Sequence, residues 1–406
     1  MLATIAALAW INSPLGDSYE RVWHTDATFG WGRFSLTNDL RHWINDGLMA
    51  VFFFLVGLEL KRELLDGELR DPRRAALPAA AALGGMILPA VLYISLNRTG
   101  IGVNGWGIPM ATDIAFVLGV LALVPRVPSG LKTFLLTLAI VDDIGAILVI
   151  AVFYSEGIHS QWLGLAVGLL VLICLVRGMN QRWRHLTTLR PVWLLSYAVL
   201  GTGVWLATLE SGVHATIAGV VLAFSVRADS ASREDEDHSC LDDDLPQIDD
   251  ELSPAERLEH SLHPWTSFGI IPLFALANAG VALDADVFKG ALRSSVTWGI
   301  VLGLVLGKLV GITAFSLVAV RLRVALLPRG VTWPQIIGAA GLAGIGFTVS
   351  LFITGLAFTQ QPAVETQGKV AVLTGSLVAA ALGAVVLLSS GRMASENHPR
   401  QEAEVA

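Results

Sequence analysis

Long apolar stretches recur from one end of the sequence to the other, and they constrain the fold more than any other feature. Each is close to the roughly 20 residues that an α-helix needs to cross a bilayer. Charged residues make up 15% of the chain and hydrophobic residues 54%, whereas a soluble domain is about one quarter charged. Because water cannot solvate so apolar a surface, the sequence predicts one polytopic helical membrane domain.

Hydropathy predicts eleven spans and a shorter apolar segment at 2–11, which together give about 12 transmembrane helices in an all-α polytopic membrane protein. The predicted spans are 43–60, 75–96, 106–124, 132–154, 161–177, 191–208, 212–226, 265–283, 296–320, 335–358 and 368–390. Since the segment at 2–11 is too short to cross a bilayer, we expect either a truncated first span or a true start of the chain that lies upstream. The sequence then divides into an N-terminal segment at 1–42, a transmembrane domain at 43–390 and a polar tail at 391–406.

The distribution of Lys and Arg predicts the orientation. Nineteen of the 27 lie in one alternating set of loops and seven in the other. Cytoplasmic loops carry the excess of positive charge, so we expect the first set and the C-terminal tail to be cytoplasmic and 21–41 to be periplasmic. The net charge of −7 arises from a loop at 227–258, which we interpret as a solvated acidic loop on the cytoplasmic side.

Two predicted spans contain clusters of helix-breaking residues. The span at 106–124 begins with Gly107 and Pro109, and the span at 335–358 carries four glycines before Thr348. Irregular backbone at membrane depth is tolerated where it lines a cavity or is buried in protein. Each irregular span is the middle member of a group of three, so we expect two broken helices in an inverted-repeat topology.

Four charged residues lie deep within predicted spans: Asp113, Asp142, Asp143 and Lys308. Each charge near the bilayer centre costs about 2.5–3.5 kcal/mol or more. Adjacent helical residues point about 100° apart, so one aspartate can face an aqueous funnel while the other pairs with Lys308. Neighbouring carboxylates also raise each other's affinity for protons. The pattern indicates a site where a small cation and protons compete; the alternative is a purely structural ion pair.

Eight stretches, in order along the chain, resemble the NhaA family of sodium/proton antiporters. They are 43–46, 56–63, 111–116, 139–146, 211–216, 257–265, 277–280 and 344–348. The resemblance implies twelve spans with two crossing broken helices. It also implies electrogenic, pH-regulated exchange of cytoplasmic Na⁺ or Li⁺ for external H⁺ across the bacterial inner membrane, which serves sodium and pH homeostasis.

The resemblance also implies roles for particular residues. Asp142 and Asp143 are expected to bind Na⁺ and protons, with Thr112 as a neighbour of the cation site. Asp113 and Lys308 are expected to balance the dipole ends of the broken helices, and Lys308 to pair with Asp142 and release its proton during transport. Neither a cofactor nor a nucleic acid is expected, and the expected partners are Na⁺, Li⁺, H⁺, membrane lipid and a second copy of the chain.

A second charged cluster lies near the cytoplasmic ends of two spans. By resemblance it forms a pH-responsive group, whose members are Glu59, Arg62, Glu63, Glu259, His260 and His263. Histidine titrates near neutral pH, which suits this role. The alternative is an ordinary charged cap of the kind common at the ends of membrane helices.

Other functions fit the sequence less well. A sodium-coupled symporter would need a pocket for an organic substrate, for which the sequence shows no polar or aromatic cluster. An intramembrane aspartyl protease would need two carboxylates that share a proton, and Lys308 is a poor neighbour for such a pair. A cation channel would need a ring of charges or carbonyls.

Overall fold

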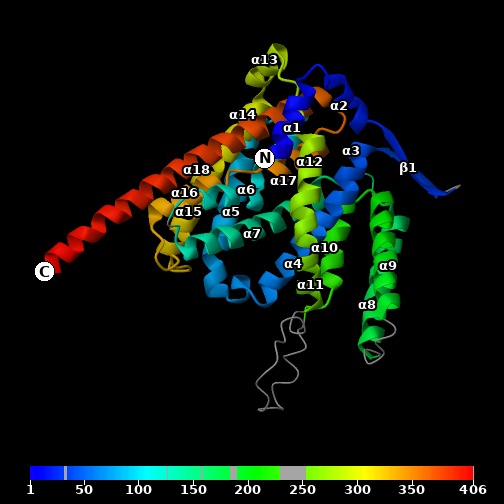
Figure 1. Ribbon diagram of the computed structural model, residues 1–406, viewed down its shortest axis with the longest axis horizontal. Helices are drawn as coiled ribbons and strands as arrows, with labels where there is room; N and C mark the ends of the chain where they lie inside the picture. Colours follow the sequence, from blue (N-terminus) through cyan, green and yellow to red (C-terminus); the bar gives the residue numbers. More distant parts are fainter. Residues whose placement is uncertain are drawn as a thin grey trace. The chain divides into compact units, whose positions relative to one another are not determined.

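The structure is a computed structural model, shown in Figure 1, and it is helical almost throughout. The described residues are 1–31, 34–125, 127–155, 157, 159–182, 190–228 and 253–405, with side chains described outside 29–36, 179–194 and 391–405. Within them the only sheet has two strands, so the prediction of an all-α membrane protein is confirmed. The chain forms two compact units, which are described separately.

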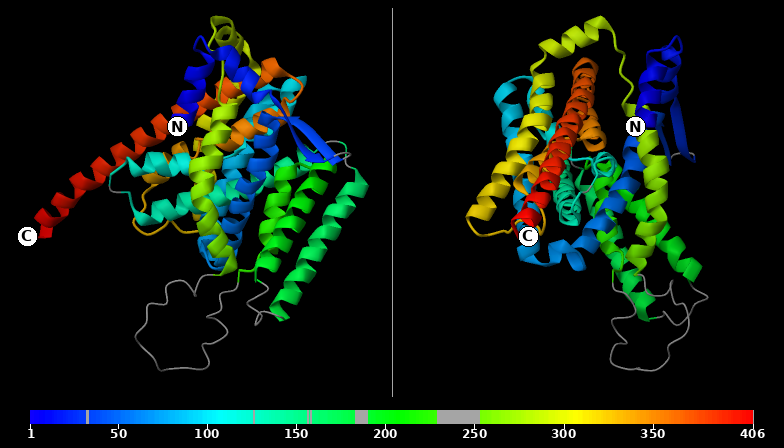
Figure 2. Two further views of the ribbon diagram at one scale, coloured as in Figure 1. Left: turned by 45° about the vertical axis from the view of Figure 1, so that its right-hand side comes forward. Right: turned by 60° about the vertical axis from the view of Figure 1, so that its left-hand side comes forward.

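The first unit combines residues 1–21, 67–150 and 275–406. Its elements are α1 (Leu2–Ile11), α2 (Gly16–Trp23), η2 (Glu68–Arg70), α5 (Pro72–Leu96), η3 (Ile101–Met110), α6 (Ile114–Ala122), α7 (Ser129–Phe153), α13 (Ala285–Arg293), α14 (Ser295–Leu302), η7 (Gly303–Gly307), α15 (Lys308–Arg321), α16 (Trp333–Leu342), α17 (Phe347–Ala357) and α18 (Pro362–Val405). The C-terminal end of α18 extends past the other helices of this unit (Figure 2). The predicted tail at 391–406 therefore continues the helix as far as Val405.

Helices long and apolar enough to cross a membrane agree with the predicted spans. Six single helices meet this criterion in the described part of the chain, and two bent helix pairs raise the number to eight. The expected total of twelve stays a prediction. One bent pair is η3 with α6, at an angle of 46°, and the other is α16 with α17, at 45°. Both helix breaks fall inside the spans whose Gly and Pro content predicted them.

Helices α5 and α15 approach each other closely through glycine. A Cβ added at Gly84 would lie 2.2 Å from the carbonyl oxygen of Gly311, and one at Gly311 would lie 2.1 Å from the carbonyl oxygen of Gly84. Small residues of this kind let the backbones of membrane helices touch and pack by van der Waals contact. Lys308 lies one turn from Gly311 on α15, so the contact between Gly84 and Gly311 also fixes how closely the backbone at Lys308 approaches α5.

The second unit combines residues 22–66 and 151–274. Its elements are β1 (Asp26–Trp31), β2 (Phe34–Asp39), α3 (Leu40–His42), η1 (Trp43–Leu48), α4 (Met49–Leu65), α8 (Ser160–Arg182), α9 (Arg190–Glu210), α10 (Ala215–Ser225), α11 (Pro254–Trp265), η6 (Thr266–Ile270) and α12 (Ile271–Asn278). Gly219 lets α10 pack closely on α4, since a Cβ there would lie 2.1 Å from the carbonyl oxygen of Ala50.

The strands β1 and β2 form an antiparallel hairpin that the sequence analysis did not predict. Asp26 pairs with Asp39 at its open end, and the hydroxyls of Thr28 and Thr37 lie 2.9 Å apart across the strands. Isolated two-stranded hairpins are marginally stable in water. Trp43 adds support from the next helix, because its indole N–H donates to the carbonyl of Ala27 over 2.9 Å.

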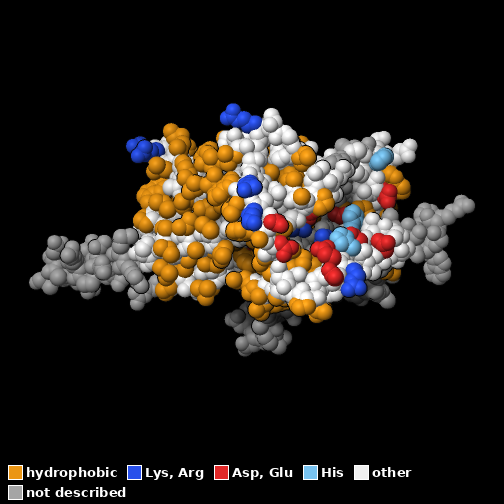
Figure 3. Space-filling view, turned by 90° about the horizontal axis from the view of Figure 1, so that it is seen from above, with side chains coloured by type: hydrophobic (Ala, Val, Ile, Leu, Met, Phe, Trp, Pro, Cys, Tyr) orange, Lys and Arg blue, Asp and Glu red, His pale blue; other side chains and the backbone are white. Residues whose placement is uncertain are grey.

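Apolar side chains cover much of the surface seen in Figure 3, and charged side chains gather in a few places. Large hydrophobic residues such as Leu123, Leu326 and Phe268 are more than 80% exposed. A water-soluble monomer rarely exposes so much contiguous apolar area, whereas lipid tails accommodate it. Most of the acidic loop predicted at 227–258 lies outside the described residues, which resume at Ser253.

Candidate ion-binding site

Two breaks in helices meet inside the first unit. Residues 111–113 separate η3 from α6, and residues 343–346 separate α16 from α17. The amide N–H of Asp113 donates to the carbonyl of Ile345 over 2.6 Å, so the two breaks are hydrogen-bonded to each other. Backbone that leaves a helix inside a membrane must find partners within the protein. Here each break supplies partners for the other.

Asp113 serves the N-terminal ends of two half-helices. One carboxylate oxygen, Oδ1, accepts from the amide of Phe116 at 3.2 Å in the first turn of α6. The other, Oδ2, accepts from the amide of Thr348 at 3.0 Å in the first turn of α17. Helix N-termini carry partial positive charge and unpaired N–H groups. A single buried carboxylate therefore lies where it offsets both, although the balancing role expected for Asp113 stays a prediction.

Lys308 and Asp142 form a fully buried ion pair, and the side chains of both are 0% exposed. The ammonium contacts Oδ2 of Asp142 and also donates to the hydroxyl of Thr112 over 3.0 Å. That hydroxyl lies 2.6 Å from the same Oδ2 and 2.9 Å from the carbonyl oxygen of Ala343. A threonine hydroxyl has one proton to donate, so it can serve only one of these two acceptors at a time.

The neighbouring carboxylates on α7 are both buried, and Asp142 is the one that pairs with Lys308. Asp142 is 0% exposed, and its second oxygen, Oδ1, has no hydrogen-bond partner within the described part of the chain. Asp143 is 5% exposed. Buried carboxylate oxygens are normally hydrogen-bonded, so Oδ1 of Asp142 is available to a ligand. The residue pattern left open which of the two acids pairs with Lys308, and the structure shows that it is Asp142.

Three groups in this site were not identified from the sequence: the carbonyls of Ala343 and Ile345 and the amide of Thr348. They are backbone groups, so residue type does not reveal them. The glycines between them are an indirect signal. A Cβ at Gly344 would lie 2.3 Å from the carbonyl oxygen of Leu304, and one at Gly346 would lie 2.5 Å from the hydroxyl of Ser350.

The residues expected to respond to pH lie in the second unit. Arg62 near the end of α4 pairs with Glu259 of α11, with 2.9 Å between Nη1 and Oε1. Burial raises the pKa of Glu259 above its usual range, and the positive charge of Arg62 counteracts part of that rise. His260 and His263 act on Glu259 in the same direction as Arg62. A capping box formed by Ser253 and Glu256 starts α11 and so positions this group.

Glu59 and Glu63, the remaining two members of that group, both lie on α4. Glu59 lies on α4 within electrostatic range of both Glu259 and Arg62. Glu63 lies one turn further along the same helix. The structure therefore brings together five of the six expected residues through charge interactions, and their role in a response to pH stays a prediction.

The apolar spanning helices define a multi-pass membrane protein. Two hydrogen-bonded helix breaks and the buried pair of Asp142 and Lys308 beside them indicate a transporter. The chain belongs to the Na⁺/H⁺ antiporter 1 family, whose model matches residues 1–387. This confirms the resemblance to the NhaA antiporters. Members of this family are transporters and not enzymes, so the aspartyl protease alternative is excluded.

Three relatives named Na⁺/H⁺ antiporter NhaA illustrate the similarity. The protein of Rhodospirillum rubrum is 47% identical over 96% of this chain and 93% of its own length. That of Shewanella loihica is 46% identical over 94% of this chain and 91% of its own. That of Koribacter versatilis is 44% identical over 98% and 90%. The chain is thus a multi-pass membrane protein of bacterial type.

Proposed function

We propose that this protein exchanges cytoplasmic Na⁺ for external H⁺ across the bacterial inner membrane, with its C-terminus in the cytoplasm. Membership of the Na⁺/H⁺ antiporter 1 family supports the exchange. The excess of Lys and Arg in one set of loops supports the orientation. Li⁺ as an alternative cargo, the surrounding lipid and a second copy of the chain as a homodimer partner belong to the same proposal.

The observation that carries the proposal is the state of Asp142. One of its oxygens is held by Lys308 and Thr112, and the other is buried with no hydrogen-bond partner in the described residues. Na⁺ is a hard cation that prefers oxygen ligands. Asp142, the adjacent Asp143 and the hydroxyl of Thr112 can supply such ligands, and the same carboxylates can hold protons instead.

Competition at Asp142 couples the two ions. When Na⁺ binds this carboxylate, the cation neutralises the negative charge of Asp142 that Lys308 otherwise neutralises. An ammonium left in a dry interior without its counter-ion is strongly destabilised, so Lys308 then releases a proton. When protons return, the ion pair re-forms and the cation leaves. With Asp143 as a second proton carrier, more than one H⁺ moves for each Na⁺, which makes the exchange electrogenic.

Regulation by pH belongs to the proposal as well, through the cluster of Glu59, Arg62, Glu63, Glu259, His260 and His263. Its best-defined contact is the Arg62–Glu259 pair. Because burial raises the pKa of Glu259, this carboxyl ionises at a higher pH than an exposed glutamate. Rising cytoplasmic pH thus ionises Glu259, and its negative charge activates the exchanger, which serves sodium and pH homeostasis.

Everted membrane vesicles from cells that lack other antiporters test this function. A fluorescent probe of the pH gradient is followed while Na⁺, Li⁺, K⁺ or choline is added at several pH values. We expect Na⁺ and Li⁺ to dissipate the gradient, and both Asp142→Asn and Asp143→Asn to abolish that response. Asp286→Asn is the matched control, since this carboxylate is 99% exposed. A folded, inserted parent protein that gives no Na⁺ response at any pH would refute the proposal.

A further inference from the structure

Helix α13 (Ala285–Arg293) lies just outside the membrane spans. It has nine residues and is therefore too short to cross a bilayer, which takes about 20. The span that begins at Ser295 follows directly, and Figure 1 shows α13 beyond that end of α14. The helix thus lies at a membrane surface, and neither the exchange mechanism nor the pH-responsive cluster uses it.

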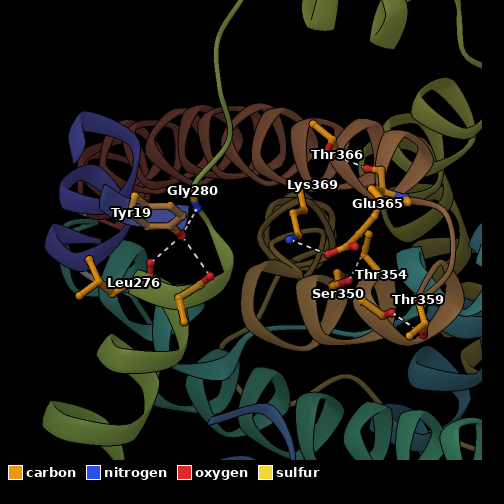
Figure 4. Close-up of polar contacts among 12 residues, drawn as sticks. Tyr19, Leu276, Gly280, Ser350, Thr354, Thr359, Glu365, Thr366 and Lys369 are labelled. Carbon is orange, nitrogen blue, oxygen red and sulfur yellow. Dashed lines mark hydrogen bonds and ion pairs between the residues drawn. The ribbon is translucent and has the colours of Figure 1, made fainter. Parts of the chain in front are cut away.

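The chain that leads into α13 is held in place by the two N-terminal helices. The hydroxyl of the buried residue Tyr19, on α2, accepts from the amide of Gly280 at 3.2 Å, as Figure 4 shows. The side chain of Asn12, which follows α1, donates to the carbonyl of Val281 over 2.9 Å and accepts from the amide of Leu283 at 2.7 Å. These contacts fix the backbone directly before the helix begins.

The inward face and the far end of α13 are fixed as well. Val287 and Ala291 belong to an apolar cluster that also contains Val370 of α18. At the C-terminal end, the indole N–H of Trp298, on α14, donates to the carbonyl of Leu292 over 2.9 Å. Because both ends and one face are held, the side chains on the other face are presented in a fixed arrangement, which lowers the entropy that a ligand would lose on binding.

The outward face carries exposed apolar side chains. Phe288 and Leu292 lie one turn apart and are 55% and 49% exposed, and Trp298 beside them is 44% exposed. We call these three residues the apolar stripe. Tryptophan favours the headgroup level of a membrane, and exposed apolar side chains that gather in one place mark an interaction surface.

Two basic side chains lie beside the apolar stripe. Lys289 and Arg293 also lie one turn apart, and each directly follows a residue of the stripe, so each points about 100° round the helix from it. Both are exposed. Lys289 lies 3.8 Å from Asp286, but these side chains are 68% and 99% exposed, and such exposed pairs are worth little. The acidic residues Asp284 and Asp286 lie at the start of the helix, which leaves positive charge at its end.

We propose that α13 is a docking surface for a phospholipid of the outer leaflet. The acyl chains cover the apolar stripe, and the phosphate accepts hydrogen bonds from Lys289 and Arg293. A phospholipid matches both features because its phosphate lies next to its apolar chains, and amphipathic helices bind membranes at this boundary. A second copy of the chain fits less well, since a specific protein interface takes about 20–30 residues on each side. The choice of leaflet rests on the proposed orientation, whereas the surface itself does not depend on exchange.

A bimane fluorophore on Ala285→Cys reports lipid at this surface, in a chain whose two cysteines, Cys174 and Cys240, are replaced by serine. Ala285 is exposed and lies one turn before Phe288 and Lys289. The purified protein in detergent is titrated with anionic phosphatidylglycerol or zwitterionic phosphatidylcholine while the emission is followed. Each Lys or Arg near an anionic surface strengthens binding about fivefold, so we expect phosphatidylglycerol to bind more tightly than phosphatidylcholine.

Three double variants make the test specific to the two basic residues. Lys289→Gln with Arg293→Gln should weaken the binding of phosphatidylglycerol about thirtyfold and remove the preference between the lipids. The matched control, Arg321→Gln with Arg329→Gln, removes two exposed arginines at the other end of the span that begins at Ser295 and should leave both affinities unchanged. Lys289→Arg with Arg293→Lys keeps the charges and should keep the parent affinity, which guards against a simple folding defect.

Equal affinities for the two lipids in the parent, or an equal loss in the control variant, would overturn the phospholipid surface. An emission change that follows protein concentration in the absence of lipid would also overturn it and would assign α13 to a contact between two copies. Because the titration measures no transport, absence of Na⁺ exchange in a protein that binds the lipid would overturn the proposed function alone.

Discussion

The contact between Gly84 and Gly311 makes a quantitative prediction about how tightly the site depends on helix packing. In Gly84→Ala the new methyl group would lie 2.2 Å from the carbonyl oxygen of Gly311 and 2.6 Å from the ring of Phe315. Ordinary contact needs about 3.4 Å, so α5 and α15 must separate by about 1.2 Å. Both neighbours are rigid, since one is backbone and the other an aromatic ring.

The free energy of unfolding should fall accordingly. Overpacking costs about 1–3 kcal/mol, and a clash with backbone belongs at the upper end of that range. Replacing glycine by alanine within a helix returns about 1 kcal/mol. The net loss is therefore about 2 kcal/mol, or about thirtyfold in the unfolding equilibrium. Since Lys308 lies one turn from Gly311, a shift near 1 Å should also lower exchange by about a hundredfold.

Thermal unfolding in detergent and Na⁺-dependent exchange in vesicles measure the two effects. Gly119→Ala is the matched control, because it places the same methyl group on helix α6 with nothing within 4 Å. We expect the control to be as stable as the parent or slightly more so. If Gly84→Ala unfolds at the same temperature as Gly119→Ala and exchanges normally, close backbone contact does not hold Lys308 in place.

Two further predictions concern the charged clusters. Lys308→Met should lower the free energy of unfolding by about 3–5 kcal/mol, because it strands the buried charge of Asp142; adding Asp142→Asn should recover much of that loss in denaturant titrations, and a fully additive double variant would contradict the buried pair. Arg62→Gln removes the charge that counteracts the rise in the pKa of Glu259, so that pKa rises further and half-maximal exchange should move to more alkaline pH. Arg74→Gln, at an arginine that is 68% exposed, should leave the pH profile unchanged, and an acidic shift in Arg62→Gln would refute the assigned sign.

Much of the fold was predictable because the bilayer permits few solutions. Runs of apolar residues have to be helices, since backbone groups find no other partners in lipid, and clustered Gly and Pro showed where two of them break. The hairpin at Asp26–Asp39 was missed. Its pairing depends on the register between two short strands and on support from Trp43, neither of which gives a hydropathy signal.

Those residues of the site were predictable whose charged side chains cost free energy at membrane depth. Asp113 and Lys308 stood out because ions rarely lie at membrane depth. The partner of Lys308 could not be chosen from the residue pattern, since α7 could rotate to present either aspartate. The carbonyls of Ala343 and Ile345 were not visible either, because every residue carries a carbonyl and only the folded backbone decides which ones turn inward.

The hydroxyl of Thr112 has a consequence that extends beyond ligand supply. It belongs to one helix break, and its two acceptors are the Asp142 carboxylate and a carbonyl of the other break. While Asp142 is negative, the hydroxyl proton is drawn to the carboxylate. Once a cation or a proton neutralises Asp142, the carbonyl of Ala343 becomes the better acceptor. One hydroxyl proton is therefore shared between the carboxylate of Asp142 and the backbone of the other helix break, so a change in the charge of Asp142 is expected to change the hydrogen bond between the two breaks.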